Sequence, residues 1–204
     1  MKLKSLLIVF AFAVLLASCS TPAIYSPKAL DELITDLKTI SSDYTIESVS
    51  VNETDKLKGD FGHVNVYLRD SEGREYIQQF FHNSLAENKP LKSRSDSDDE
   101  DEWKSRKLPP ALTIEEIAKQ KGNIEKYIDE AVRQVTEGFD GKYDFRSVQR
   151  LEFSADEAGA LQIQFTLNAT PKDQSAQIDG RRITTTYYEL NFIVDKDGKV
   201  VPGE

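Results

Sequence analysis

The stretch Tyr143-Asp144-Phe145-Arg146-Ser147-Val148 has an earlier counterpart, Tyr44-Thr45-Ile46-Glu47-Ser48-Val49, which begins 99 residues before it. In both stretches polar and apolar residues alternate, and the alternation then changes parity at the same place. A strand that changes parity in this way needs one extra residue, as in a β-bulge. The two stretches therefore predict bulged strands at matching positions of an internal repeat.

The segments on either side of these strands match in the same order. A shift of 98 residues aligns Leu30, Leu33, Ile34 and Leu37 with Ile128, Ala131, Val132 and Val135. A shift of 97 aligns Gly62, Val64, Val66 and Leu68 with Gly159, Leu161, Ile163 and Phe165. Because all three matches run in chain order with nearly equal shifts, we expect a tandem duplication.

In the first half, Ser26 followed by Pro27 is a helix start, and apolar residues at helical spacing predict a helix over 27–40. Alternating apolar residues predict strands over 44–51, 63–69 and 74–81. Asp70-Ser71-Glu72-Gly73 predicts a hairpin turn between the last two strands. The first half is therefore expected to be an α-β-β-β unit.

The second half has the same order of elements. Thr113 and Glu116 have capping-box spacing, which predicts a short helix that ends near Gly122. Asn123 can cap a second helix that ends before Gly138. Strands are expected over 143–153, 160–168, 183–194 and 199–201, with a polar loop over 169–182.

An acidic run separates the two halves and holds six carboxylates, at Asp96, Asp98, Asp99, Glu100, Asp101 and Glu102. So charged a segment buries too little apolar surface to offset the entropy lost on ordering, and we predict a disordered linker over 86–111. A calcium loop is the alternative interpretation. It requires glycine and glutamate where a count from Asp96 finds Asp101 and Lys107.

These elements predict an α+β fold in which tandem α-β-β-β repeats form an antiparallel sheet with the helices on one face. The predicted organisation is a signal peptide over 1–18, a lipidated tether over 19–26, repeats over 27–85 and 112–204, and the acidic linker over 86–111 between them.

The first residues have the grading of a secretory signal, because lysines precede an apolar run from Leu6 to Leu16 that is too short to span a bilayer. Leu16-Ala17-Ser18-Cys19 resembles the lipobox of bacterial lipoproteins. The resemblance implies cleavage before Cys19, attachment of diacylglycerol to its thiol and anchoring in the lipid bilayer. Ser20, which is not aspartate, implies the outer membrane, facing the periplasm.

Composition restricts the possible partners. The formal charge is −9, and removal of Lys2 and Lys4 with the signal peptide makes it −11. An acidic chain repels phosphate, so we expect no nucleic-acid partner. Cys19 is the single cysteine, which excludes an intrachain disulfide and leaves no thiol for catalysis once it is acylated.

The closing segment, residues 188–200, reads as an apolar strand followed by Asp-Lys-Asp-Gly-Lys-Val. This ending and the tandem units resemble PepSY-like lipoproteins and, more distantly, the two-repeat beta-lactamase inhibitor proteins. The resemblance implies a non-enzymatic module that binds or inhibits an envelope protein or peptide.

Sequence motifs for chemistry are few. His63 and His82 are the only histidines, and their spacing does not suit a metal site, so we expect both to be partly exposed strand residues. No nucleophile elbow, phosphate-binding glycine loop or Cys-x-x-Cys pair occurs. We therefore expect no catalytic residue, metal or cofactor. The alternative is a small envelope hydrolase that uses carboxylates the sequence does not identify.

Strand alternation predicts a polar face on the side of the sheet opposite the helices. Its expected members are His63, Asn65, Tyr67, Arg69, Gln162, Gln164, Thr166, Glu189 and Asn191. Such a face suits a protein or peptide partner, with Asn65, Tyr67, Arg69, Gln162, Gln164, Glu189 and Asn191 as candidate contacts. A merely solvated face is the other interpretation.

The lipobox gives the first testable prediction. Replacing Cys19 with alanine removes the thiol that is acylated, so Cys19→Ala should leave the protein unprocessed and release it from the membrane fraction. Globomycin-sensitive processing and detergent partition measure this. An unchanged membrane fraction in the variant would contradict the lipobox assignment.

Overall fold

The computed structural model describes residues 21–82, 87–94, 110–138, 140–173, 177–179 and 182–203. The predicted signal peptide, Cys19 and the acidic run lie outside these residues. The predicted tether does not extend to residue 26, because Ala23 bridges Asp60 and the Phe61 amide donates to the Pro22 carbonyl at 2.9 Å. Pro22, three positions after Cys19 in the sequence, is therefore already part of the fold.

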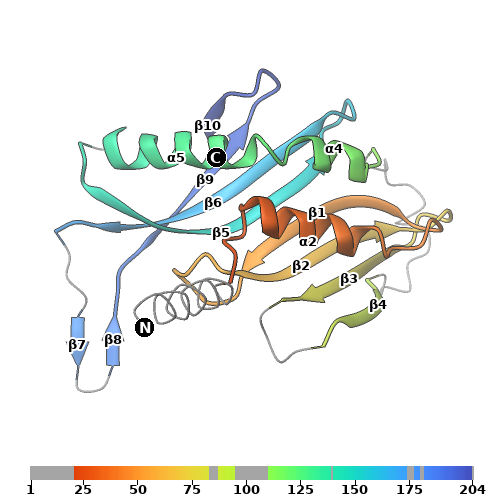
Figure 1. Ribbon diagram of the computed structural model, residues 1–204, viewed down its shortest axis with the longest axis horizontal. Helices are drawn as coiled ribbons and strands as arrows, with labels where there is room; N and C mark the ends of the chain where they lie inside the picture. Colours follow the sequence, from red (N-terminus) through yellow and green to blue (C-terminus); the bar gives the residue numbers. More distant parts are fainter. Residues whose placement is uncertain are drawn as a thin grey trace, which may run out of the picture.

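The fold is α+β and is built on an eight-stranded antiparallel sheet with the order β10-β9-β6-β5-β1-β2-β3-β4 (Figure 1). Its strands are β1 Thr45–Glu53, β2 Phe61–Arg69, β3 Glu75–Phe81, β4 Lys89–Ser93, β5 Tyr143–Ala155, β6 Leu161–Pro171, β9 Tyr188–Val194 and β10 Val200–Pro202. β7 Gln177–Asp179 and β8 Arg182–Thr184 form a separate hairpin that projects from the body.

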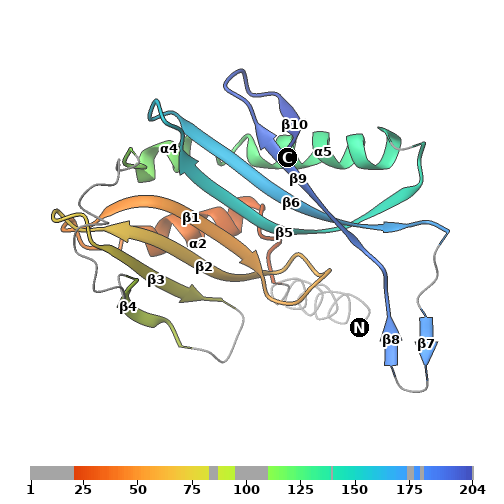
Figure 2. The ribbon, with the colours of Figure 1, turned by 180° about the vertical axis from the view of Figure 1, so that it is seen from behind.

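Three described helices cover one face of the sheet, and Figure 2 shows the opposite face without them. They are α2 Pro27–Leu37, α4 Ile114–Lys119 and α5 Ile124–Gly138. α2 packs on β2, α5 packs on β5 and β10, and α4 packs against α2. Two of the three predicted caps are confirmed, since Ser26 accepts the Ala29 amide and Thr113 and Glu116 form the capping box. The Asn123 side chain, predicted to cap α5, donates instead to Gln120 Oε1 at 3.2 Å.

The structure corrects three predicted boundaries. α2 ends at Leu37 and not at residue 40. Lys89–Ser93, predicted as linker, is strand β4, which the sequence hides because it holds one apolar residue and a proline. The strand predicted over 183–194 is divided, because β8 pairs with β7 while pairing with β6 begins only at Tyr188.

Both predicted bulges are confirmed. The β1–β2 register shifts between Ile46 and Ser48, and the β5–β6 register shifts between Phe145 and Ser147. Next to the bulges, Leu68 lies opposite Ile46 and Ala169 lies opposite Phe145, so the residues that face the two bulges are 101 positions apart and not the 97 of the sequence alignment. An error of four residues preserves period-2 alternation, so the predicted faces are unaffected.

Three hairpins use the same turn chemistry, centred on Asp70, Asp156 and Asp195. In each, the aspartate Oδ1 accepts backbone amides two and four residues ahead at 2.8 to 2.9 Å. A glycine three residues after each aspartate has φ between 76° and 87°, a backbone conformation that glycine adopts without strain. Burial raises the pKa of Asp70, but hydrogen bonds from Arg74, Tyr76 and the Glu72 amide lower it by a larger amount, so the pKa lies below its usual value.

One continuous core lies between the sheet and the helices and includes residues from both halves of the chain. Val66 is 0% exposed and Ile163 is 4% exposed, whereas their strand neighbours Asn65 and Gln162 are half-buried on the other face. The predicted phase of both middle strands is therefore confirmed.

This phase gives a stability prediction. Truncation of a buried aliphatic side chain leaves a cavity, so Val66→Ala and Ile163→Ala should each lower the free energy of unfolding by about 1.5 to 4 kcal/mol. Gln162→Ala should cost within about 0.5 kcal/mol, as a surface change does. Asn65→Ala also loses the 2.7 Å bond from Gln79, worth about 1 kcal/mol. Urea denaturation measures all four, and equal losses at Gln162 and Ile163 would refute the phase.

Candidate binding surface

The sheet face away from the helices is polar along its four central strands. On β1 and β5, the apolar pairs Val49–Phe153 and Val51–Leu151 face the helices. The pairs that alternate with them in the register, Ser50–Glu152 and Asn52–Arg150, therefore face the opposite side. We call this side the open face, since no described helix covers it (Figure 2).

The register places all nine predicted face residues on the open face. Asn65 lies opposite Ser50 on one side and Gln79 on the other, and Tyr67 lies opposite Ser48. Gln164 lies opposite Glu152, and Thr166 opposite Asn191, whose Oδ1 accepts the threonine hydroxyl at 2.9 Å. Strand alternation alone therefore predicted correctly that these residues of β2, β6 and β9 share one face of the sheet.

Exposure divides the predicted contact residues. Glu189 and Asn191 are exposed, while Asn65, Tyr67, Gln162 and Gln164 are half-buried. Arg69 is only 7% exposed and pairs with Glu47 of the bulge at 3.0 Å. Arg69 therefore supports the sheet and offers little surface to a partner, which argues against its prediction as a contact residue.

A hollow of about 410 Å³ lies on the open face over the centre of the sheet. It is lined by Glu47, Ser48, Ser50, Tyr67, Arg94, Arg150, Glu152, Ser154 and Ala155. The Arg94 guanidinium stacks 4.7 Å from the centroid of the Tyr67 ring, which places a cation at the rim. Tyr67 is thus the predicted residue that lines this hollow.

A second, smaller hollow of about 220 Å³ continues the first toward β9 and shares Arg150 and Glu152 with it. Gln164, Thr166 and Asn191 also line it. The two hollows form a shallow trough that crosses the strands. Arg150 and Glu152 lie at its midpoint with their charged groups 3.6 Å apart, a separation at which exposed charges interact weakly and remain available to a ligand.

The residues that the sequence analysis missed are on the central strands, and they are Ser48, Ser50, Arg150, Glu152 and Ser154. They alternate with buried apolar residues just as the predicted ones do, so the same signal identifies them once the bulges are counted. Arg94 carries no such signal, because it reaches the trough only through the pairing of β4 with β3.

One end of the open face is covered by the loop between β1 and β2, residues 54–60. Glu53 is 8% exposed, and its carboxylate accepts the Leu57 amide at 3.2 Å and the Gly59 amide at 2.8 Å. It also accepts from Asn168 Nδ2 at 3.0 Å, which joins the two halves of the sheet. Glu53 therefore fixes this loop against β6.

Neither histidine suggests a catalytic or metal site. His63 is half-buried on the open face, and burial together with the charge of Lys89 lowers its pKa. His82 is half-buried on the helix face, with Nε2 2.7 Å from Asp36 Oδ2 and its ring stacked on Phe61. Within the described ranges, no group of three or more histidine, cysteine, aspartate or glutamate side chains is placed to hold a metal ion.

The role of Glu53 can be tested by Glu53→Gln. The glutamine amide presents an NH₂ group to donors that now meet a carboxylate oxygen, so the free energy of unfolding should fall by about 1 to 3 kcal/mol. The matched control is Asp55→Asn in the same loop, where the ion pair with Lys58 is exposed and should contribute little to stability. Urea denaturation of both variants measures the difference; equal effects would show that Glu53 is not the fixing group.

A cavity larger than either hollow of the trough lies on the helix face, between α5 and β9, and not on the predicted surface. None of the described helices is long and apolar enough to cross a membrane. Comparison with protein-family models, with curated proteins and with solved structures finds no match.

Proposed function

We propose that this chain is a lipid-anchored envelope lipoprotein whose folded domain binds a protein or peptide, without catalysis, on the open face. The observation that carries the proposal is the trough across the central strands, which combines a stacked arginine, paired opposite charges and hydroxyl groups. Arginine and tyrosine are enriched at protein interfaces, and Arg94 over Tyr67 offers both at one rim.

The trough supports binding better than hydrolysis. General acid–base catalysis needs carboxyl groups with shifted pKa values in a cleft from which water can be excluded. The two glutamates that line the first hollow, Glu47 and Glu152, are each paired with an arginine, and the hollow is shallow and open. A partner with complementary charges can form ion pairs with both Arg150 and Glu152.

The proposed anchor places the domain close to the bilayer. Pro22 is already held to β2, and only Ser20 and Thr21 separate it from Cys19. An extended chain spans about 3.3 to 3.6 Å per residue, so the anchored cysteine lies within roughly 10 Å of the folded domain. We infer a partner that is itself at the membrane surface, on the periplasmic side of the outer membrane.

We also infer that the two halves arose by duplication. Two matching tyrosine pairs support this, since Tyr44 and Tyr76 meet edge to face at 5.1 Å and Tyr143 and Tyr188 do so at 5.6 Å. Tyr76 lies opposite Leu68 and Tyr188 lies opposite Ala169, which are corresponding residues by the register at the bulges. This tandem arrangement is what the resemblance to PepSY-like lipoproteins implies, and with it a binding or inhibitory role.

Site-specific photocross-linking tests the open face. A benzoylphenylalanine at position 150 should capture a discrete partner in intact cells, because Arg150 lies at the middle of the trough. Capture should fall at least tenfold when Tyr67→Ala or Glu152→Ala is added. The matched control carries the photoreactive residue at Lys126, an exposed position on α5. Equal products from positions 126 and 150, or none from position 150, would refute the proposal.

A further inference from the structure

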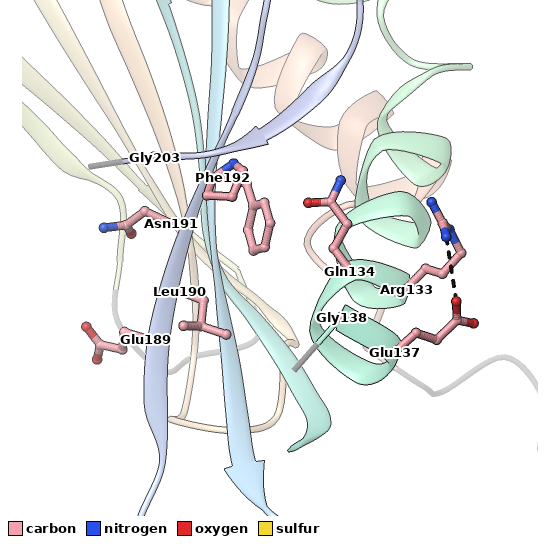
Figure 3. Close-up of a pocket in the computed structure, with 10 residues that line it drawn as sticks. Arg133, Gln134, Glu137, Gly138, Glu189, Leu190, Asn191, Phe192 and Gly203 are labelled. Atoms are coloured by element: carbon pink, nitrogen blue, oxygen red, sulfur yellow. Dashed lines mark ion pairs between the residues drawn. The ribbon is translucent and has the colours of Figure 1, made fainter. Parts of the chain in front are cut away.

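A cavity of about 630 Å³ lies on the helix face at the outer edge of the sheet. Figure 3 shows Leu190 and Phe192 directed toward α5, whereas Glu189 and Asn191 point to the other side of β9. Gln134 and Arg133 of α5 form the opposite wall. The cavity therefore has an apolar floor on the strand and a polar rim on the helix.

The corresponding place in the first half is occupied. Counted from the matched tyrosines Tyr76 and Tyr188, Gln78 and Phe80 of β3 correspond to Leu190 and Phe192 of β9. There, β4 extends the sheet, and its Leu91 packs against the core. The space that remains beside Leu91 is only about 260 Å³.

The edge of β9 beside the cavity is unpaired in the described part of the chain. β10 pairs with β9 only at Phe192–Val194, and the last bond on that side joins the Gly203 amide to the Asn191 carbonyl at 2.8 Å. Backbone groups alternate in direction along a strand, so the amide and carbonyl of Glu189 face the same edge. On β3, the corresponding residue is Ile77, which pairs with Lys92 of β4.

We propose that an extended peptide adds to this edge of β9 as β4 adds to β3, with an aliphatic side chain in the cavity where Leu91 lies in the first half. Strand addition provides main-chain hydrogen bonds, and the cavity selects the side chain. The residue after the aliphatic one would lie opposite Glu189, as Lys92 lies opposite Ile77, and facing opposite charges stabilise a strand pair. The partner is therefore a segment with a basic residue directly after its leucine or isoleucine.

The probe is a fluorescent peptide with the sequence of residues 87–94, which contains Leu91 and Lys92. Fluorescence anisotropy should show saturable binding to the full chain. A peptide with Leu91→Ser should bind at least tenfold more weakly, because it leaves the cavity empty. Equal affinity of the two peptides would reduce the interaction to surface charge and overturn the proposal, as would no binding at millimolar concentration.

The edge itself is tested by Glu189→Pro, which removes the outward amide while leaving the bonds of β9 to β6 in place. Glu189→Thr is the matched control, since it loses the charge and the bond from Gln149 but keeps the amide. We expect at least tenfold weaker peptide binding for the proline variant than for the threonine variant. Equal binding would overturn strand addition at β9 and assign the peptide to another surface.

A second variant does not depend on tolerance of proline. Leu190→Trp fills the cavity and leaves the edge amides unchanged, and it should abolish the difference between the two peptides. A different outcome would overturn the proposal and assign the cavity to an acyl chain. In that outcome a monomeric alkyl detergent displaces the peptide from the wild type, and Leu190→Trp and Glu189→Pro bind the peptide equally well. Neither hollow of the trough is lined by Glu189 or Leu190, so the trough and the β9 edge can fail independently of each other.

Discussion

The short ladder between β1 and β5 holds the two halves of the sheet together. Five residue pairs, Ser48–Asn52 with Arg150–Ser154, join two half-sheets that would otherwise each end in an unpaired edge strand. The pairs Val49–Phe153 and Val51–Leu151 belong to the core, each side chain at most 1% exposed. Ser48, Ser50, Arg150, Glu152 and Ser154 of the alternate pairs line the trough, so the contact that unites the fold also builds the candidate site.

The two halves differ where their outer edges are completed. In the first half β4 covers the beginning of β3, and in the second half β10 covers the end of β9. The remainder of the β9 edge lies beside an apolar cavity, where exposed backbone groups and an apolar floor coincide. Proteins usually protect such edges, so an edge left open beside a cavity is a functional feature to be tested.

Local sequence rules predicted most of the elements and both bulges, because caps, turns and alternation act within a few residues. They also predicted that Asn65, Tyr67, Gln164 and Asn191 share a face, since side chains alternate along any strand. They missed β4 and Arg94, because Lys89–Ser93 becomes a strand only through its pairing with β3. They placed Arg69 at the surface, because alternation predicts which face a side chain lies on but not whether neighbours such as Glu47 cover it.

The α+β class, the helix starts at Ser26 and Thr113, the parity of the strands and the position of the bulges can all be predicted from the sequence, because each depends on neighbours within one or two turns. The pairing of β1 with β5, which places residues about 100 positions apart face to face, follows only from the packing of the whole domain. The same packing sets which polar residues are covered and which edge stays open. Those outcomes depend on contacts between distant segments, for which a single sequence carries no periodic signal.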